Sequence, residues 1–270
     1  MQFFVDTADI DQIKEAYSWG IVDGVTTNPS LIKKAVDKLK AQGSSAGIED
    51  YIGEILRAAD GDPVSLEVIG CDEATMYAQG MRLFERFNPI AENVVVKIPV
   101  NPEMGDGTAH FDGLKVINRL AEQGIPVNVT LVFTPEQALL AAKAGAAYVS
   151  PFAGRIDDEL RRAAASTASK MSYWPMAGDG QHELDGMVSG VDLIEQCVDI
   201  LTVHDLDGCQ VLAASLRTAR QVRECALVGA HVATAPFEVL ESMIRHAKTV
   251  EGMRAFTADI VPEYSRLFTD

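Results

Sequence analysis

The chain has 270 residues, with 23 basic and 39 acidic side chains and a formal net charge of −16. This excess of acid opposes contact with nucleic acid or with an anionic membrane surface. The sequence opens on a strand-like run and holds no apolar segment long enough to span a bilayer, so we expect neither a signal peptide nor a membrane anchor.

The cysteines and histidines show no pattern of a metal site. The four cysteines form no CxxC pair, and the five histidines lack ligand spacings such as HExxH. Unpaired thiols are typical of a reducing compartment. We therefore expect a cytoplasmic protein that needs neither a metal nor another cofactor.

The first half of the chain alternates short β-branched runs with amphipathic stretches. The runs predict strands over residues 3–6, 24–28, 64–69 and 93–99. Helices are expected to begin near Asp9, to cover 31–40 and 51–56, and to run from a cap at Asp72 to about Phe87. Asn88-Pro89 is expected to end the last of these helices.

The second half continues the alternation. Strands are predicted over 127–133, 148–152, 210–215 and 231–236, and helices over 114–120, from Thr134, over 158–165 and 191–203, from Thr218, and over 238–247. The segment 166–190, rich in Gly, Met and acids, is long for a connection and is interpreted as a lid or an insertion after the sixth strand. Residues 250–268 predict one additional amphipathic helix.

Eight β-then-α units indicate an α/β protein with a parallel sheet that closes into a (β/α)8 barrel, a TIM barrel. We expect residues 1–270 to form this single domain, with an extra C-terminal helix. An open, doubly wound sheet is the competing fold, but no GxGxxG motif follows any early strand.

The run from Asn93 to Pro99 places one lysine, Lys97, inside an apolar strand. Burying an ammonium group costs several kcal/mol unless the group is paired or gives up its proton. A neutral amine on a buried strand is a nucleophile that can attack a carbonyl and form a Schiff base. The alternative is that Lys97 reaches solvent at the strand end or pairs with a carboxylate.

Polar residues lie in or just after seven of the eight predicted strands. In a barrel the carboxyl ends of all strands meet at one mouth, so these side chains should converge. They are Asp6, Asn28, Glu67, Lys97, Asn128, Thr130, Ser150, Arg155, Ser215 and Arg217.

Ordered blocks along nearly the whole chain resemble the transaldolase and fructose-6-phosphate aldolase family. They are FVDTADI, GVTTNPSLI, VVVKIP, NVTLVF, YVSPFAGRID and VLAASLRT, followed by the terminal helical segment. The resemblance implies that Lys97 is the Schiff-base lysine and Asp6 the acid/base carboxylate. It also implies that Asn28 and Asn128 bind the ketose and that three residues form a phosphate cradle: Arg155, Ser215 and Arg217.

Two positions separate the branches of this family by resemblance. Glu67 and Phe152 resemble transaldolases, whereas the fructose-6-phosphate aldolases have Gln and Tyr there. We expect transfer of a dihydroxyacetone unit from sedoheptulose 7-phosphate to glyceraldehyde 3-phosphate, which gives erythrose 4-phosphate and fructose 6-phosphate. Glu67 and Thr130 could hold a water that moves protons at the lysine.

Two other functions stay open. One is an aldolase-type lyase that cleaves fructose 6-phosphate, and the other is a non-catalytic sugar-phosphate binder. Small members of the family resemble ring-forming oligomers, so we expect a homo-oligomer, a pentamer or a decamer, with the tail helix packed on a neighbouring subunit. The alternative is that the tail helix packs on its own barrel.

Overall fold

The computed structural model describes residues 1–41, 47–105, 110–175 and 182–268. Eight described strands, each parallel to its neighbours, form a closed barrel in sequence order, because β1 also pairs with β8. They are β1 (Gln2–Asp6), β2 (Gly24–Thr26), β3 (Val64–Glu67), β4 (Val94–Pro99), β5 (Val127–Val132), β6 (Tyr148–Pro151), β7 (Gln210–Ala213) and β8 (Val232–Ala235).

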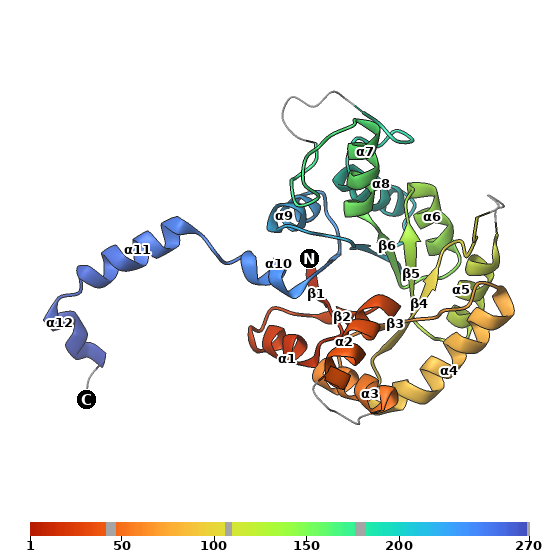
Figure 1. Ribbon diagram of the computed structural model, residues 1–270, viewed down its shortest axis with the longest axis horizontal. Helices are drawn as coiled ribbons and strands as arrows, with labels where there is room; N and C mark the ends of the chain where they lie inside the picture. The colour runs from red at the N-terminus through yellow and green to blue at the C-terminus, as the bar shows by residue number, and fades with distance from the viewer. Residues whose placement is uncertain (42–46, 106–109, 176–181, 269–270) are drawn as a thin grey trace.

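Helices surround this barrel and alternate with its strands (Figure 1). The predicted (β/α)8 barrel is therefore confirmed. The helices are α1 (Ile10–Ser18), α2 (Pro29–Ala41), α3 (Ile48–Ala58), α4 (Glu73–Ala91), α5 (Asp112–Glu122), α6 (Pro135–Lys143), α7 (Ala153–Ala163), α8 (Gly190–Val203), α9 (Ala219–Leu227) and α10 (Phe237–Ser242).

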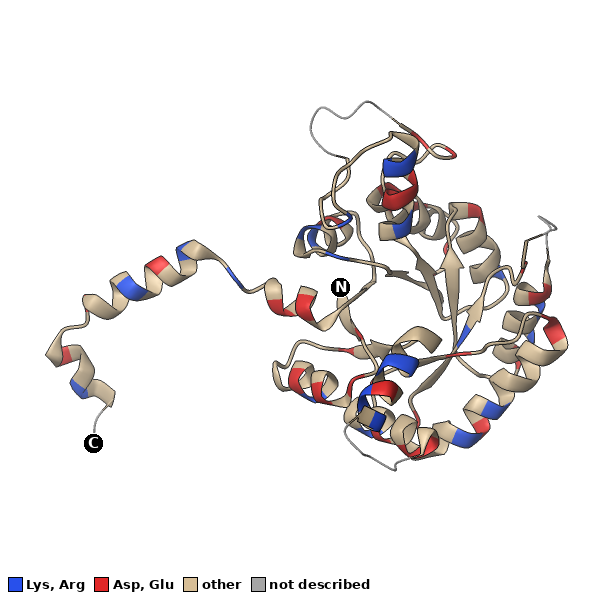
Figure 2. Cartoon of the chain, in the orientation of Figure 1, with Lys and Arg blue, Asp and Glu red and all other residues tan. Residues whose placement is uncertain are grey.

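The strands are buried on both faces, which explains their nearly continuous apolar sequences. Their outer faces pack on the helices, and inside the barrel Phe4 packs with Leu212 and Val232. Gly24 leaves room for the Phe4 ring, since a Cβ there would lie 2.6 Å from a ring atom. Charged residues lie mostly on the surrounding helices and loops (Figure 2).

Strand register brings the polar residues of neighbouring strands to the same level. Lys97 of β4 pairs in register with Glu67 of β3 and with Asn128 of β5. Asp6 of β1 pairs with Thr26 of β2. Residues at one level of parallel strands point to the same face, so the register itself assembles a polar layer at the barrel mouth.

Helix α4 does not end before Asn88-Pro89, as the sequence predicted, but continues to Ala91. Pro89 lies in the last turn, where its missing N–H removes only one helical bond. The end of the helix is closed instead by Glu92, which has a φ of 55° and donates its N–H to the Asn88 carbonyl at 2.7 Å. The Asn88 side chain then accepts the Val94 N–H at 3.1 Å and leads the chain into β4.

The region between β6 and β7 differs from the prediction in the bounds of its first helix. Helix α7 begins at Ala153, five residues before the expected start, and ends at Ala163, so the segment 166–190 follows a helix. In its described part, Trp174 and Met187 are buried in the core, and Trp174 donates from Nε1 to the Val188 carbonyl at 3.2 Å. Residues 176–181 lie outside the described residues, and the role of the segment as a lid stays a prediction.

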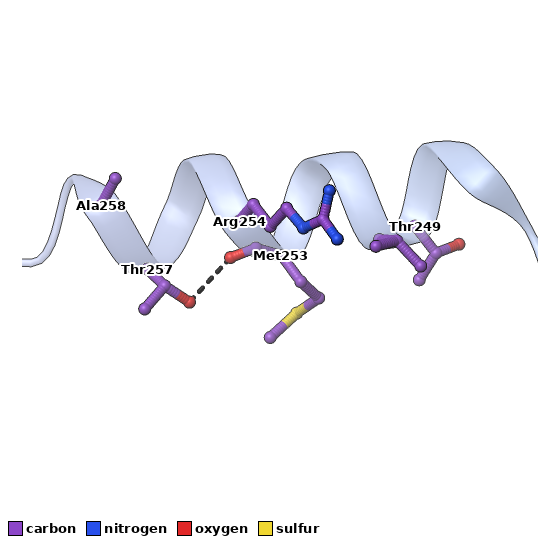
Figure 3. A pocket seen from close by; sticks show the side chains of 6 residues that line it. Thr249, Met253, Arg254, Thr257 and Ala258 are labelled. Atoms are coloured by element: carbon purple, nitrogen blue, oxygen red, sulfur yellow. Dashed lines mark hydrogen bonds between the residues drawn. The ribbon is translucent and has the colours of Figure 1, made fainter.

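The C-terminal tail consists of α11 (Ala247–Ala258), α12 (Pro262–Ser265) and a 3-10 turn, η1 (Arg266–Phe268), rather than the one helix expected. Pro262 cannot donate an N–H to a continuing helix, which explains the break. No residue of these three elements is buried. The tail extends away from the barrel beyond α10 (Figure 1). Exposed residues of α11, among them Thr249, Met253 and Thr257, line a hollow on this helix (Figure 3).

Within the described ranges, none of the helices is both long enough and apolar enough to cross a bilayer.

Candidate active site

Lys97 lies in the middle of the barrel mouth, on a strand whose other residues are apolar. Only 6% of its surface is exposed. Its Nζ lies 3.1 Å from Glu67 Oε2 and donates to the Thr27 carbonyl at 3.1 Å. The buried charge is therefore paired, which offsets much of the cost of removing it from water. The same contact places a carboxylate beside the amine, where it can take up the proton that the amine must lose before it attacks.

Asp6 ends β1 and is held by a chain of hydroxyl groups. Thr26 Oγ1 donates to Asp6 Oδ1 at 2.7 Å and lies 2.5 Å from Thr234 Oγ1. Because one hydroxyl has one proton, an ionised Asp6 requires Thr234 to donate to Thr26 and Thr26 to donate to Asp6. Burial raises the pKa of Asp6 above its ordinary value, while the hydrogen bond from Thr26 and the charge of Lys97 oppose that rise. Asp6 can thus exchange a proton at the mouth.

Asn128 is fully buried and held on both sides of its amide. Its Nδ2 donates to Ser65 Oγ at 3.0 Å, and its Oδ1 accepts from Ser150 Oγ at 2.6 Å. The three residues come from β3, β5 and β6. These bonds fix the orientation of the amide next to Lys97, so Asn128 is prepared to bind a polar group without further ordering.

A cavity of about 160 Å³ lies over Lys97 at the carboxyl ends of the strands. Residues from seven of the eight strands, or from the positions just after them, surround it. They are Asp6, Thr26, Asn28, Lys97, Asn128, Ser150, Phe152, Arg155, Ala214, Ser215 and Thr234. The structure therefore brings together eight of the eleven residues that the sequence selected.

Arg155 and Ser215 form one edge of this cavity. Arg155 belongs to the first turn of α7, where backbone N–H groups and the helix dipole favour an anion. Its guanidinium lies 5.2 Å from the centre of the Phe152 ring. Ser215 has a φ of 61° and turns the chain sharply after β7. Charge, hydroxyl and helix N-terminus thus converge on one side of the mouth.

Arg217 does not line the cavity. Its Nη1 and Nη2 instead donate to the two carboxylate oxygens of Asp158, at 2.6 and 2.5 Å. This paired fork is the strongest geometry that a guanidinium and a carboxylate can adopt. The sequence predicted Arg217 as a phosphate ligand without indicating this partner.

Glu67 and Thr130 also lie outside the cavity lining, although Glu67 contacts Lys97. Glu67 lines a second cavity, of about 660 Å³, which it shares with Asn28. Thr130 pairs in register with Pro99, two residues beyond Lys97, and is therefore one level farther along the strands. Asn28 Oδ1 accepts the Leu31 N–H at 3.0 Å, so its amide nitrogen is the group left for a ligand.

Comparisons with known proteins identify the relatives of this chain. The family model described as Transaldolase/Fructose-6-phosphate aldolase matches residues 3–267. A protein from Aquifex aeolicus named probable transaldolase is 41% identical over 259 residues, which cover 96% of each chain. Proteins of the same name from Ruegeria sp. and Desulfatibacillum aliphaticivorans are 44% and 43% identical to this chain. Both alignments cover 96% of this chain, and they cover 96% and 97% of the respective relatives.

The chain belongs to the transaldolase and fructose-6-phosphate aldolase family. The resemblance found in the sequence blocks is thereby confirmed. Membership supports an enzyme of the transaldolase kind that acts on sugar phosphates, and it weighs against a non-catalytic binder.

Sequence reasoning missed the hydroxyl residues that position the site. Thr26 and Thr234 lie within β-branched runs, where threonine is simply a good strand former. Ser65 is a small residue between two apolar neighbours in β3. Only the register across strands reveals that all three contact Asp6 or Asn128, directly or through one hydroxyl.

The described residues bring together no group of three His, Cys, Asp or Glu side chains that could hold a metal ion. That the enzyme needs no cofactor stays a prediction.

Proposed function

We propose that the protein is a class I transaldolase, which transfers a dihydroxyacetone unit through a Schiff base on Lys97. The observation that carries this proposal is a buried lysine that lines the mouth cavity 3.1 Å from the Glu67 carboxylate. Binding alone does not require a buried amine. A lysine nucleophile needs a nearby base and a desolvated pocket, and Lys97 has both.

The reaction begins when Lys97 Nζ, after losing a proton, attacks the carbonyl carbon of a ketose phosphate. The carbinolamine formed must lose water, which requires a proton on its oxygen. Glu67 is the carboxylate nearest to the amine, and Thr130 is the hydroxyl of the next level, so these two residues would hold the water that moves protons. The product is an iminium ion.

The iminium draws electrons from the adjacent carbon–carbon bond. Asp6 takes the proton from the hydroxyl whose oxygen becomes the carbonyl of the leaving aldehyde, and the bond electrons form an enamine on Lys97. A carboxylate with a raised pKa is suited to accept this proton and later return it. Asn28 and Asn128 hold hydroxyl groups of the donor, and Ser150 keeps the Asn128 amide in place.

The phosphate of the sugar lies at the other side of the mouth in this proposal. Arg155 and Ser215 at the cavity edge, with Arg217 and the first turn of α7, would supply the local positive charge and the donors that a dianion needs in a chain with a net charge of −16. A substrate placed between this side and Lys97 spans the cavity.

Phe152 favours transfer over simple cleavage. Its ring lines the cavity but has no hydroxyl with which to direct water at the enamine. The three-carbon unit should therefore stay on Lys97 until an aldehyde phosphate accepts it. On this basis we propose the reaction of sedoheptulose 7-phosphate with glyceraldehyde 3-phosphate, which belongs to the pentose phosphate pathway. The second candidate is the aldolase that releases free dihydroxyacetone.

The test is to supply fructose 6-phosphate with and without erythrose 4-phosphate and to measure two products. A transaldolase forms sedoheptulose 7-phosphate with the acceptor and releases little dihydroxyacetone without it. Equal rates of cleavage and transfer would favour the aldolase. No turnover of either kind would contradict both.

The exposed tail supports assembly with further copies of the chain. Its stripe of large apolar residues, at Met253, Phe256, Ile260, Tyr264 and Leu267, is more than half exposed in the single chain. A patch of this kind marks an interface.

We propose a homo-oligomer, a pentamer or a decamer in the cytoplasm, in which each tail packs on a neighbouring subunit. Light scattering should show one large species, and Phe256→Ser with Tyr264→Ser should dissociate it. A monomer at micromolar concentration in the wild type would contradict assembly.

A further inference from the structure

Two adjacent acids, Asp157 and Asp158, follow Arg155 on α7 and face the loop that carries Arg217. Asp157 is buried, whereas a quarter of the Asp158 side chain is exposed, 24%. Neither lines the mouth cavity. Their contacts nevertheless determine how the loop after β7 and its arginine are held.

Asp157 fixes the backbone of this loop. Its Oδ2 accepts from Gln221 Nε2 at 2.8 Å, and Gln221 Oε1 in turn accepts the Arg217 N–H at 2.8 Å. Its Oδ1 accepts the Gly190 N–H at 2.7 Å, at the start of α8. The backbone of Arg217 is thus tied through Gln221 of α9 to the buried Asp157 carboxyl of α7, which also holds the start of α8.

Asp158 fixes the guanidinium group. It occupies Nη1 and Nη2 of Arg217, which leaves Nε and the outer N–H of one Nη for another ligand. The Nε atom lies over Gly154, since a Cβ on that glycine would be 3.2 Å from it. The same Cβ would lie 2.1 Å from the Ser215 carbonyl oxygen. Gly154 therefore allows the Nε edge of Arg217, Ser215 and the first turn of α7 to come together.

The charge of Asp158 does not cancel the attraction for an anion. Lys170 Nζ lies 3.5 Å from Asp158 Oδ2, and Arg161 Nη1 lies 3.4 Å from Oδ1. With Arg217, three cations therefore surround this one carboxylate. Burial alone would raise the pKa of Asp158, but the hydrogen bonds and charges of Arg217 and Lys170 outweigh it and lower that pKa. Asp158 stays ionised, and the cluster keeps net positive charge.

We propose that Asp158 is a positioning residue for phosphate recognition: it holds Arg217 by one side of its guanidinium so that the Nε side faces a sugar phosphate at the start of α7. The proposal rests on the proposed function, because it specifies how that substrate is held.

The experiment measures binding of inorganic phosphate by titration calorimetry to the full chain and its variants. Arg217→Ala should weaken binding roughly 10- to 100-fold, as expected for lost hydrogen bonds to a charged ligand. Asp158→Asn should weaken it at least roughly 5-fold, and Asp158→Glu, which keeps the charge, should lose less. Glu159→Gln is the matched control: it removes the same charge from the same helix, but Glu159 pairs with Arg162.

The decisive comparison is the double variant Asp158→Asn with Arg217→Ala. If Asp158 acts through Arg217, the double variant should bind phosphate no more weakly than Arg217→Ala alone. Unchanged or tighter phosphate binding in Asp158→Asn would overturn the proposal, because Asp158 would then only compete with the ligand. Losses that add in the double variant would also overturn it, as would a wild type that does not bind phosphate.

Borohydride trapping with dihydroxyacetone, which has no phosphate, is measured in the same variants and should be unchanged in Asp158→Asn. If the wild type gave no trapped adduct, the proposed function would be contradicted, while the phosphate titration would still decide the role of Asp158.

Discussion

The two sides of the barrel mouth are built in different ways. On the side of Lys97, Glu67 and Asn128, the functional groups belong to adjacent strands and are fixed by register and by buried hydrogen bonds. On the side of Arg155 and Arg217, they belong to a helix start and a loop, and Arg217 is held by an ion pair with Asp158 that solvent partly reaches.

This difference separates the two tasks of the proposed reaction. Bond making needs atoms held to a fraction of an ångström in a dry environment, which parallel strands provide. Capture of a phosphate needs charge that extends toward solvent and can adjust to sugars of different length. Variants on the strand side should therefore change kcat, and variants on the loop side should change KM.

The largest expected effect is that of Asp6→Asn on the strand side. Loss of the acid/base group should lower kcat roughly 100- to 10,000-fold and leave KM nearly unchanged. Steady-state kinetics with fructose 6-phosphate and erythrose 4-phosphate measures both constants. Asp11→Asn, which changes an exposed acid at the start of α1, is the control. A large rise in KM with an unchanged kcat would show that Asp6 only binds substrate.

The same variant should stabilise the fold at neutral pH. The pKa of Asp6 is raised by burial from an ordinary 3.8, so below that value both the folded and unfolded states are protonated and Asp6 contributes nothing. As the pH rises, the unfolded state ionises first and wild-type stability falls. Asn avoids this loss, so its Tm should exceed that of the wild type at pH 7, and the gap should shrink toward pH 4. If the variant had a lower Tm than the wild type at both pH values, the predicted direction of this effect would be wrong.

Arg155→Ala tests the loop side. Lost hydrogen bonds to a phosphate, worth roughly 1.5 to 3 kcal/mol, should raise KM for fructose 6-phosphate about 10- to 100-fold. Trapping of unphosphorylated dihydroxyacetone should not change. Arg162→Ala on the same helix, which loses only a pair with Glu159, is the matched control. Equal losses with both substrates would mean that Arg155 is structural.

Thr26→Val sharpens the account of the hydroxyl chain with a smaller effect. Without the hydrogen bond from Thr26, the charged form of Asp6 is less stable, and its pKa should rise further. The acidic limb of the kcat profile should move upward by about one pH unit, which corresponds to about 1.4 kcal/mol. Thr234→Val should move it less, because Thr234 acts through Thr26. A shift to lower pH would contradict the arrangement.

Phe152→Tyr should give the smallest effect, a several-fold shift from transfer toward release of free dihydroxyacetone. A hydroxyl at this ring would hold a water near Lys97 and speed hydrolysis, by less than the roughly 2.7 to 4 kcal/mol that a donor at the reacting atoms can give. Phe133→Tyr adds the same group to the neighbouring ring, whose centroid lies 5.7 Å away, and should change nothing. A parallel fall in both activities would indicate damage to the mouth.

The placement of several site residues could be predicted from the sequence, but the contacts of Arg217 could not. Lys97, Asp6 and Asn128 are polar residues in apolar runs, and in a closed barrel the inward-facing ones near the strand ends meet at the mouth. The partner of Arg217 could not be predicted, because Asp158 lies 59 residues away in sequence and resembles any acidic residue on the exposed face of a helix. The continuation of α4 through Pro89 was missed because the closing bonds come from Asn88 and Glu92, which local propensity does not reveal.

The central claim, a Schiff base on Lys97, has one direct test. The enzyme is incubated with fructose 6-phosphate, reduced with borohydride and digested, and the modified peptide is identified by mass spectrometry. We predict one reduced sugar adduct on the peptide that contains Lys97, its loss in Lys97→Met, and its retention in a control that replaces the exposed Lys33. An adduct on another lysine, or none in the wild type, would contradict the account.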